Sequence, residues 1–567
     1  MTVRPREGEP NTPNMNHRLS HPSHPTRRGL PIAMLMLFSV TSLHADEYPV
    51  DTTIDVLHYR FELRLRDATD SIEGMATVLI RFLREVRAPL RLDLSGTGVD
   101  RDGKGMQVDT VWVDDRVAAF RRSGDVLWIE AGELRQAGRD ARVRIRYRGI
   151  AADGLHAVRD RTGTRGFFSD NWPNKTRNWL PTIDHPHEKA TCEFIVTAPA
   201  HFQVVSNGLV REISVLDDST HRTHWVQSVP ISAWLYTLGV SHFAMEVTGY
   251  FEGRPLQSWV YAKERDAGFR DFSEPTADVL RYLTGYAGPF AYEKIANIES
   301  PIVGGGMEAA SAIGYNERMI DGRKSKRVRN VIIHELAHQW FGNAVTEATW
   351  DDAWLSESFA TYFTLRYIEH AYGAEEYREE LARARNLYEA HLSKGDSFPI
   401  LASRTAETGP VTNYAVTYQK GAWVLTMLRD LIGEEAFRKG IRDYYGTHFN
   451  ATARTSDLVG CMERASGMRL DRFFRQWLYR SGRIDAAYSW RYDPGKRMLE
   501  VSLTQTGKSD DAYAFPLDIR VESEGYSADR RMEVDAARMT WRFPIKRMPE
   551  RVILDPGGKL LARFRQL

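Results

Sequence analysis

The segment VRNVIIHELAHQWFGN, residues 328–343, contains the motif His334-Glu335-Leu336-Ala337-His338. Its apolar residues predict a buried helix that ends near Gly342 and Asn343, which are common helix stops. At 3.6 residues per turn, His334 and His338 project from one face, so both imidazoles can bind one small cation. Glu335 lies roughly 100° around the helix, close enough to reach a metal-bound water without being a ligand. The segment therefore predicts a metal site on a buried helix.

A second predicted helix supplies a third ligand. Glu357 lies in the segment WLSESFA, residues 354–360, with eighteen residues between it and His338. A turn rich in Thr and Asp separates the two helices, which can therefore pack side by side. Two His and one Glu with an open fourth position form a catalytic zinc site, whereas structural zinc is usually closed by four ligands, mostly Cys. We expect one Zn²⁺ per chain; two satisfied core histidines are the weaker alternative.

The chemistry of such a site follows from its residue types. Zinc held by three protein ligands acidifies its water and polarises a bound carbonyl. Glu335 can take the proton of that water and pass it to a leaving amine. An additional donor is needed for the oxyanion. Asp352, in the turn, either orients a ligand imidazole or is a plain turn residue. The residues alone indicate hydrolysis of an amide or ester carbonyl.

Composition excludes some classes of function. The 567 residues carry 76 Lys+Arg against 75 Asp+Glu, a net charge of +1, which predicts no nucleic-acid partner. Hydrophobic residues make up 42% and charged residues 27%, as in ordinary globular proteins. The two cysteines, Cys192 and Cys461, are too few for a disulfide framework, and we expect two inert thiols.

The N-terminal region reads as a targeting segment. Residues 29–45, GLPIAMLMLFSVTSLHA, form a short apolar run preceded by Arg27 and Arg28 and closed by the small Ala45. This layout is typical of a secretory signal, and the run is shorter than the about 20 apolar residues of a membrane-spanning helix. We therefore expect residues 1–45 to be a signal peptide, the protein to be exported (periplasmic or secreted), and no stable membrane span after cleavage.

The remaining chain divides by its hydrophobic period. Alternating apolar residues predict strands near residues 59–65, 76–82 and 90–94, a helical period follows from about Glu274, and alternation returns from about Ala486. Helices are expected around residues 328–341, 356–370, 374–392, 414–431 and 434–446. The predicted fold is multidomain α+β, with a β-sheet domain at 46–247, a mostly helical domain at 248–483 and a small β-sandwich at 484–567.

Four further segments carry a family resemblance. They are Gly305-Gly306-Met307-Glu308-Ala309, Tyr418-Gln419-Lys420-Gly421-Ala422, the stretch RNWLPTID at 177–184, and VSNG at 205–208. With the His334–His338 motif and Glu357, they resemble the gluzincin metallopeptidases, and in particular the aminopeptidase N family. That family includes membrane alanyl aminopeptidase and the leukotriene hydrolases. The resemblance implies that the helical domain is thermolysin-like.

The resemblance also implies roles for individual residues. Glu308 would bind the free α-amino group of a peptide, with Gly305, Gly306 and Met307 beside the substrate. Tyr418 would donate to the oxyanion, and Tyr414, one turn earlier, is its rival. The expected function is a zinc aminopeptidase of peptide catabolism, acting on peptides with a free N-terminus. The alternatives are a related gluzincin with endopeptidase or non-peptide substrates and a peptide-binding protein without turnover.

Two positions depart from the family pattern. Ala309 stands where the family usually has Asn. The Gln that commonly precedes the segment beginning at Arg177 is missing, and Trp172 lies near its position. Both changes would leave fewer side chains to bind the substrate amine. The chain ends after the small β-sandwich, without the long helical domain of many relatives, so we expect little enclosure of long peptides.

Overall fold

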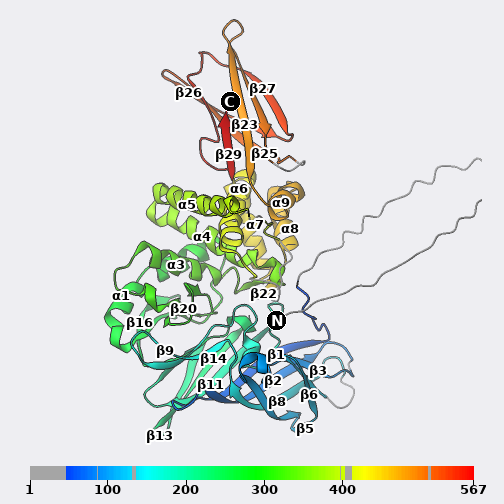
Figure 1. The fold of residues 1–567 in the computed structure, drawn as a ribbon, viewed down its shortest axis with the longest axis vertical. Helices are drawn as coiled ribbons and strands as arrows, with labels where there is room; N and C mark the ends of the chain where they lie inside the picture. The colour runs from blue at the N-terminus through cyan, green and yellow to red at the C-terminus, as the bar shows by residue number, and fades with distance from the viewer. Residues whose placement is uncertain (1–45, 86, 131–135, 396–397, 402–410, 508–511) are drawn as a thin grey trace, which may run out of the picture. The chain divides into compact units, whose positions relative to one another are not determined.

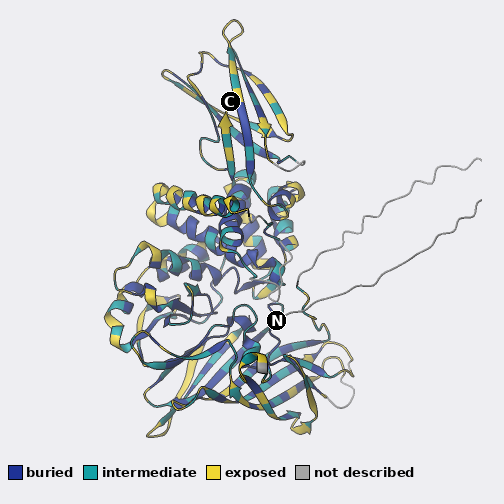
Figure 2. Cartoon of the chain, in the orientation of Figure 1, coloured by how far each residue is buried: buried dark blue, intermediate teal, exposed yellow. Residues whose placement is uncertain are grey.

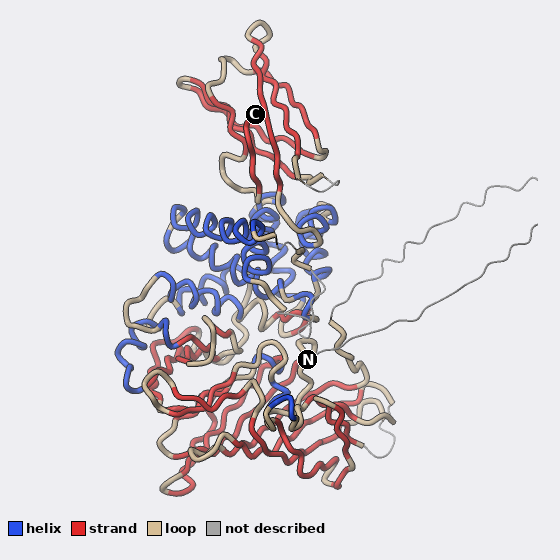
Figure 3. Tube along the Cα trace, in the orientation of Figure 1, coloured by secondary structure: helices blue, strands red, loops and turns tan. Residues whose placement is uncertain are grey.

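The computed structural model describes residues 46–567, apart from 86, 131–135, 396–397, 402–410 and 508–511. The predicted signal peptide, residues 1–45, lies outside the described residues. Along the chain, strands come first, helices dominate the middle, and strands return at the end (Figures 1 and 3). The predicted multidomain α+β fold is confirmed.

The N-terminal domain is built on an eight-stranded sheet in the order β13-β14-β11-β1-β2-β8-β4-β5. Its strands are β1 (Ile54–Arg64), β2 (Ser71–Phe82), β4 (Gly105–Val113), β5 (Arg116–Ala118), β8 (Asp140–Ile150), β11 (Lys189–Pro199), β13 (Leu209–Asp217) and β14 (Thr220–Ser232). Neighbours are antiparallel except for the parallel pair β1–β11. The alternating residues Phe61, Leu63, Val78 and Ile80 are all buried, as a half-covered sheet requires.

Two smaller sheets complete this domain. One has the order β12-β15-β10-β9, and the other has the order β3-β7-β6. Their strands are β3 (Leu90–Asp93), β6 (Phe120–Ser123), β7 (Val126–Ile129), β9 (Leu155–Arg159), β10 (Arg165–Ser169), β12 (Gln203–Ser206) and β15 (Leu238–Ser241).

The central domain begins with a five-stranded sheet in the order β16-β17-β18-β20-β19. The strands are β16 (Phe243–Phe251), β17 (Arg254–Tyr261), β18 (Ile295–Ser300), β19 (Gly306–Met307) and β20 (Ala312–Asn316). Because β16 belongs to this sheet, the sheet starts a few residues before 248, where the sequence pattern placed the boundary. The short strand β19 pairs with β20 alone and forms the edge of the sheet.

The helices of the central domain are α1 (Arg265–Phe272), α2 (Thr276–Tyr286), α3 (Lys326–His338), α4 (Trp354–Tyr372), α5 (Ala374–Ser393), α6 (Gly421–Ile432), α7 (Glu434–Thr447), α8 (Thr455–Ser466) and α9 (Asp471–Leu478). A π-helical turn at Tyr414–Lys420 runs directly into α6. Among these helices, α3, α4, α5 and α7, and α6 with the turn before it, match the five expected segments closely. The helix α4 is buried along most of its length and packs against α3, α5 and α6 (Figure 2).

The C-terminal domain is a β-sandwich of two sheets. One has the order β27-β24-β23-β29 and the other β26-β25-β28. Their strands are β23 (Ile484–Asp493), β24 (Met498–Gln505), β25 (Phe515–Ser523), β26 (Tyr526–Val534), β27 (Arg538–Pro544), β28 (Arg551–Leu554) and β29 (Ala562–Gln566). The alternating residues Leu499, Val501, Leu517 and Ile519 are fully buried between the sheets.

Cys192 and Cys461 are both buried and unpaired. Among the described residues, no helix combines the length and the apolar character needed to cross a bilayer.

Candidate metal centre and active site

The helix α3 carries the metal motif and is fixed at both ends. At its start the Ser325 hydroxyl accepts a hydrogen bond from the Val328 amide at 3.3 Å. Just after its end, Gly342 has a φ of +117°, and a Cβ there would lie 2.2 Å from the Ser356 hydroxyl. Only glycine therefore lets the chain turn between α3 and α4 at this distance. The turn brings α4 back along α3, so that Glu357 faces the two histidines.

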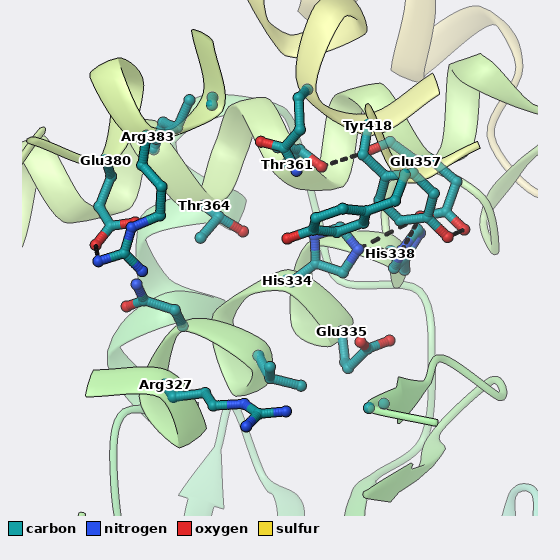
Figure 4. Close-up of a pocket in the computed structure, with 18 of the residues that line it drawn as sticks. Arg327, His334, Glu335, His338, Glu357, Thr361, Thr364, Glu380, Arg383 and Tyr418 are labelled. Carbon is teal, nitrogen blue, oxygen red and sulfur yellow. Dashed lines mark hydrogen bonds and ion pairs between the residues drawn. The ribbon is translucent and has the colours of Figure 1, made fainter. Parts of the chain in front are cut away.

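The three predicted ligands converge. Nε2 of His334 lies 3.1 Å from Nε2 of His338, and Oε2 of Glu357 lies 3.4 Å and 3.3 Å from these two atoms. Ligands at 2.0–2.1 Å around tetrahedral zinc are separated by about 3.3–3.4 Å, so the trio has the spacing of such a site. Oε2 of Glu357 is buried and accepts no hydrogen bond. The three side chains point toward one another in Figure 4, and their geometry fits zinc.

Nδ1 of His338, the nitrogen that faces away from the metal position, contacts partners other than Asp352. It lies 3.2 Å from the main-chain oxygen of Phe341 and 2.9 Å from the Ser356 hydroxyl. A carbonyl can only accept, so the proton sits on Nδ1 and the Nε2 lone pair faces the metal position. Asp352 instead accepts from the amide and hydroxyl of Thr455, at 2.9 and 2.6 Å. Of the two interpretations of Asp352, the structural one is correct, because it caps the start of α8.

The site holds an excess of negative charge. Burial opposes ionisation of Glu357, yet the adjacent His338 and His334 lower its pKa to about 2. Burial likewise opposes a charge on His338, but Glu308, Glu357 and Glu335 together raise its pKa to about 10. Burial lowers the pKa of His334. Several carboxylates beside two imidazoles are an arrangement that a divalent cation neutralises in place of the proton on His338.

Glu335 lies on the adjacent face of α3, against the edge strand β19. A Cβ on Gly306 would come within 2.3 Å of the Glu335 carboxyl group, so the glycine makes room for this side chain. Burial, with the nearby Glu308 charge, raises the pKa of Glu335 well above its usual range. A buried carboxylate with a raised pKa beside a metal position suits a general base.

Glu308 lies at the other side of the metal trio, just after β19. Its carboxylate is buried, its Oε1 has no hydrogen-bond partner among the described residues, and Nδ1 of His338 lies 3.9 Å from it. Its main-chain oxygen is fixed by the side-chain amides of Gln339 and Asn343 at 3.1 and 2.6 Å. Burial raises the pKa of Glu308 to about 7; His338 opposes this shift, whereas Glu357 and Asp170 add to it. A ligand ammonium would satisfy this carboxylate.

Tyr418 reaches the site from the π-helical turn. Its hydroxyl donates a 2.6 Å hydrogen bond to Oε1 of Glu357, and its ring stacks on His334 at 5.9 Å. Burial, with the charge of Glu357, raises the Tyr418 pKa well above its usual range, so the phenol stays a donor. Tyr414, the rival, is 61% exposed.

A cavity of about 810 Å³ opens beside these residues. Its lining includes the metal trio, Glu335, Glu308, Tyr418 and the run of glycines before β19: Gly304, Gly305 and Gly306. Met307 is not part of the lining; its side chain is buried beneath the sheet near Val303 and Gly314. The Met307 side chain therefore points away from the cavity, because alternate residues of a strand point to opposite faces, and a contact of Met307 with substrate stays a prediction.

Some residues of the site were missed in the sequence. Ser356 holds His338, and Gln339 and Asn343 hold Glu308, although all three lie within the motif-bearing segments. Asp170, in the β domain, is close enough to Glu308 to raise its pKa. Trp172 instead packs edge-on against Trp234 and Trp350, with ring centroids 4.9 and 4.7 Å away. In the sequence, the only sign of Asp170 was its position, seven residues before Arg177.

A two-histidine, one-glutamate site with an open side, on packed helices beside an edge strand, defines a zinc metallohydrolase. Comparison with known proteins then identifies the family of metallohydrolases. Residues 56–235 match the peptidase M1 N-terminal domain, and residues 274–477 match the peptidase family M1 domain. The chain belongs to the peptidase M1 family, which confirms the aminopeptidase N-like gluzincin resemblance and the single zinc site.

Individual relatives agree with this assignment. Glutamyl aminopeptidase of Sus scrofa is 31% identical over 326 residues, which cover 55% of this chain and 34% of that protein. A probable aminopeptidase 1 of Saccharolobus solfataricus is 27% identical over 54% of this chain and 40% of its own length. The matched part of this chain thus spans well under half of these relatives. The M1 zinc metallopeptidase of Deinococcus radiodurans superposes with a TM-score of 0.63 and 26% identity, over 75% of this chain and 94% of that one.

Proposed function

We propose that this chain is a zinc-dependent aminopeptidase that hydrolyses N-terminal residues from peptides. The observation that carries the proposal is Glu308, a buried carboxylate without a hydrogen-bond partner on Oε1, placed beside the metal trio. An unneutralised buried carboxylate is costly, and a substrate ammonium would remove that cost. Binding the amine next to the metal leaves room for one residue before the scissile bond.

The residues of the chain divide the chemistry among them. Zinc, held by His334, His338 and Glu357, would supply the Lewis acidity that activates water and polarises the carbonyl. Glu335 accepts the proton of the attacking water and returns it to the leaving amine, so no net proton is consumed. The Tyr418 hydroxyl, now on Glu357, is the nearest phenol donor for the developing oxyanion.

The test compares free and N-acetylated forms of the same aminoacyl amides and short peptides, with zinc measured in the same preparation. We expect about one zinc per chain and cleavage of the free forms only. Glu335→Gln should retain zinc and lose turnover. Equal cleavage of acetylated peptides would contradict the proposal and indicate an endopeptidase, and absence of all turnover would contradict catalysis altogether.

Glu308→Gln tests the amine site directly. It should raise KM and lower kcat/KM for free peptides by about tenfold or more, because an ammonium–carboxylate contact is replaced by a neutral one. Glu347→Gln is a matched control, since Glu347 is also a buried carboxylate without a hydrogen-bond partner but does not line the cavity. Equal losses in both variants would remove the role of Glu308.

We further propose that the protein is exported and serves peptide catabolism. The support is the apolar run at 29–45 with its preceding arginines and closing Ala45. N-terminal sequencing of the mature protein from its native host should give a start near Asp46. A mature chain that begins before Gly29 would contradict the proposal.

A further inference from the structure

The cavity extends along α3, and residues from both ends of this helix line it. Glu308 lies beside His338 at the C-terminal end of this helix, and Gly306 lies beside Glu335 one turn earlier. Arg327, at the N-terminal end, also lines the cavity. His338 lies eleven positions after Arg327, or about 16 Å along the helix. A peptide with its amine at Glu308 and its carbonyl at the metal trio therefore extends its remaining residues past the glycines toward Arg327.

The end of the cavity near Arg327 carries basic side chains from two helices. Arg327 comes from α3 and Arg383 from α5, and both line the cavity together with Tyr414 (Figure 4 labels the two arginines). In Figure 4 both arginines lie on the side of the cavity away from His338. Glu380 lines the same cavity and lies beside Arg383.

The charges at this end do not cancel. Glu380 pairs with Arg383 at 3.5 Å, and Lys326, next to Arg327, pairs with Glu376 at 3.3 Å. Within the described part of the chain, the Arg327 guanidinium has no hydrogen-bond or ion-pair partner. One guanidinium thus remains available to an anion that enters the cavity, and guanidinium groups suit carboxylates because they can donate two parallel hydrogen bonds.

We propose that Arg327, supported by Arg383, binds a carboxylate of the substrate and selects short peptides by their C-terminus. This inference rests on the proposed aminopeptidase function. An extended chain advances about 3.3–3.5 Å per residue, so the terminal carboxylate of a tripeptide lies about 7 Å beyond the scissile carbonyl. Arg327 is seven residues, or about 10 Å, before His334 along the helix. The long arginine side chain spans the remaining distance to the terminal carboxylate of a tripeptide or a tetrapeptide. An acidic side chain at the third residue offers the same chemistry.

The experiment measures kcat and KM for one tripeptide as the free acid and as the C-terminal amide. Two further substrates separate the sources of the carboxylate: an amidated tripeptide with Asp as third residue, and a free-acid hexapeptide whose terminus lies beyond Arg327. An aminoacyl anilide, which has no carboxylate, reports the aminopeptidase reaction alone. We expect the free tripeptide acid to exceed its amide by about tenfold in kcat/KM, mainly through KM. The hexapeptide should show no difference between acid and amide.

In Arg327→Gln the acid-to-amide ratio should fall to about one, and in Arg383→Gln it should fall less. The ratio is taken within each variant, so a general loss of activity cancels. Arg323→Gln is the matched control, because Arg323 is 82% exposed and lies outside the cavity lining; its ratio should equal that of the wild type. A wild-type ratio of one, or an unchanged ratio in Arg327→Gln, would overturn the inference.

The same substrates distinguish failure of the proposed carboxylate site from failure of the proposed aminopeptidase function. If the anilide is cleaved but the ratio is one, only the carboxylate site is refuted. If the anilide is not cleaved by zinc-loaded protein, the aminopeptidase function itself fails. If the amidated Asp tripeptide is preferred as strongly as the free acid, the site recognises a carboxylate in either place and does not select peptides by length.

Discussion

The hydroxyl of Tyr418 donates a 2.6 Å hydrogen bond to Oε1 of Glu357, whose Oε2 faces both imidazoles. One carboxylate therefore links the phenol to the metal position. The contact orients Glu357 and holds the phenol beside the metal position, next to the His334 ring.

Tyr418→Phe is expected to lower kcat by about 10²-fold, the usual cost of one oxyanion donor, while zinc content stays near one per chain. Steady-state kinetics and elemental analysis of the same sample measure both. Tyr414→Phe is the control, since Tyr414 lines the same cavity but is largely exposed. If Tyr414→Phe is impaired and Tyr418→Phe is not, the donor has been misassigned.

Gly306→Ala should displace the general base. The added Cβ would lie within 2.3 Å of the Glu335 carboxyl group, so this buried side chain must move. We expect kcat to fall at least tenfold, since general-base catalysis is sensitive to position. Zinc content should be unchanged, because Glu335 is not a ligand. At Gly304 a Cβ meets nothing within 4 Å, so Gly304→Ala should lose much less. Similar losses in both variants would point to substrate binding instead.

Metal removal should abolish activity without unfolding the β domains. The strands bury apolar residues of their own, whereas the trio His334, His338 and Glu357 lies on α3 and α4. Chelation at neutral pH should lower the melting temperature of the central domain, because zinc binds only the folded site. Circular dichroism with activity measurements before and after zinc addition tests this. Loss of the strand signal on chelation would contradict the expectation.

Because His187 is largely buried, we expect the free energy of unfolding to fall as the pH is lowered. Nδ1 of His187 contacts Nδ1 of His185 at 2.6 Å, and burial, with the charge of His185, lowers the His187 pKa to about 3. The folded state thus favours neutral His187, so this stability is present above about pH 6.5 and is lost as pH falls toward 3. Between pH 7 and pH 5 the loss amounts to up to about 2 kcal/mol.

Urea unfolding midpoints of His187→Gln should therefore depend less on pH than those of the wild type across this range. His201→Gln serves as control, since the His201 side chain is 57% exposed. An identical pH dependence of His187→Gln and wild type would exclude His187 as the source.

Much of the fold followed from local periodicity. Period-two residues such as Phe61 and Val78 marked buried strand faces, and the four-residue spacing of His334 and His338 placed both rings on one helix face. These features depend on neighbours in sequence, whose relative positions the backbone geometry already fixes. The glycines before Glu308 and the segment around Tyr418 were found by family resemblance, and their geometry could not be read from spacing.

The sequence by itself determined the ligand types, the general-base candidate and the order of strands and helices, because each can be read from residue types and from their spacing along the chain. Only the tertiary structure decided that Ser356, and not Asp352, holds His338, that Asp170 lies near Glu308, and that the Met307 side chain leaves the cavity. Those relationships join segments far apart in the chain or faces of one strand, and packing of the whole domain sets them. The unpartnered Arg327 belongs to the same group, since its availability depends on which carboxylates the neighbouring helices bring to it.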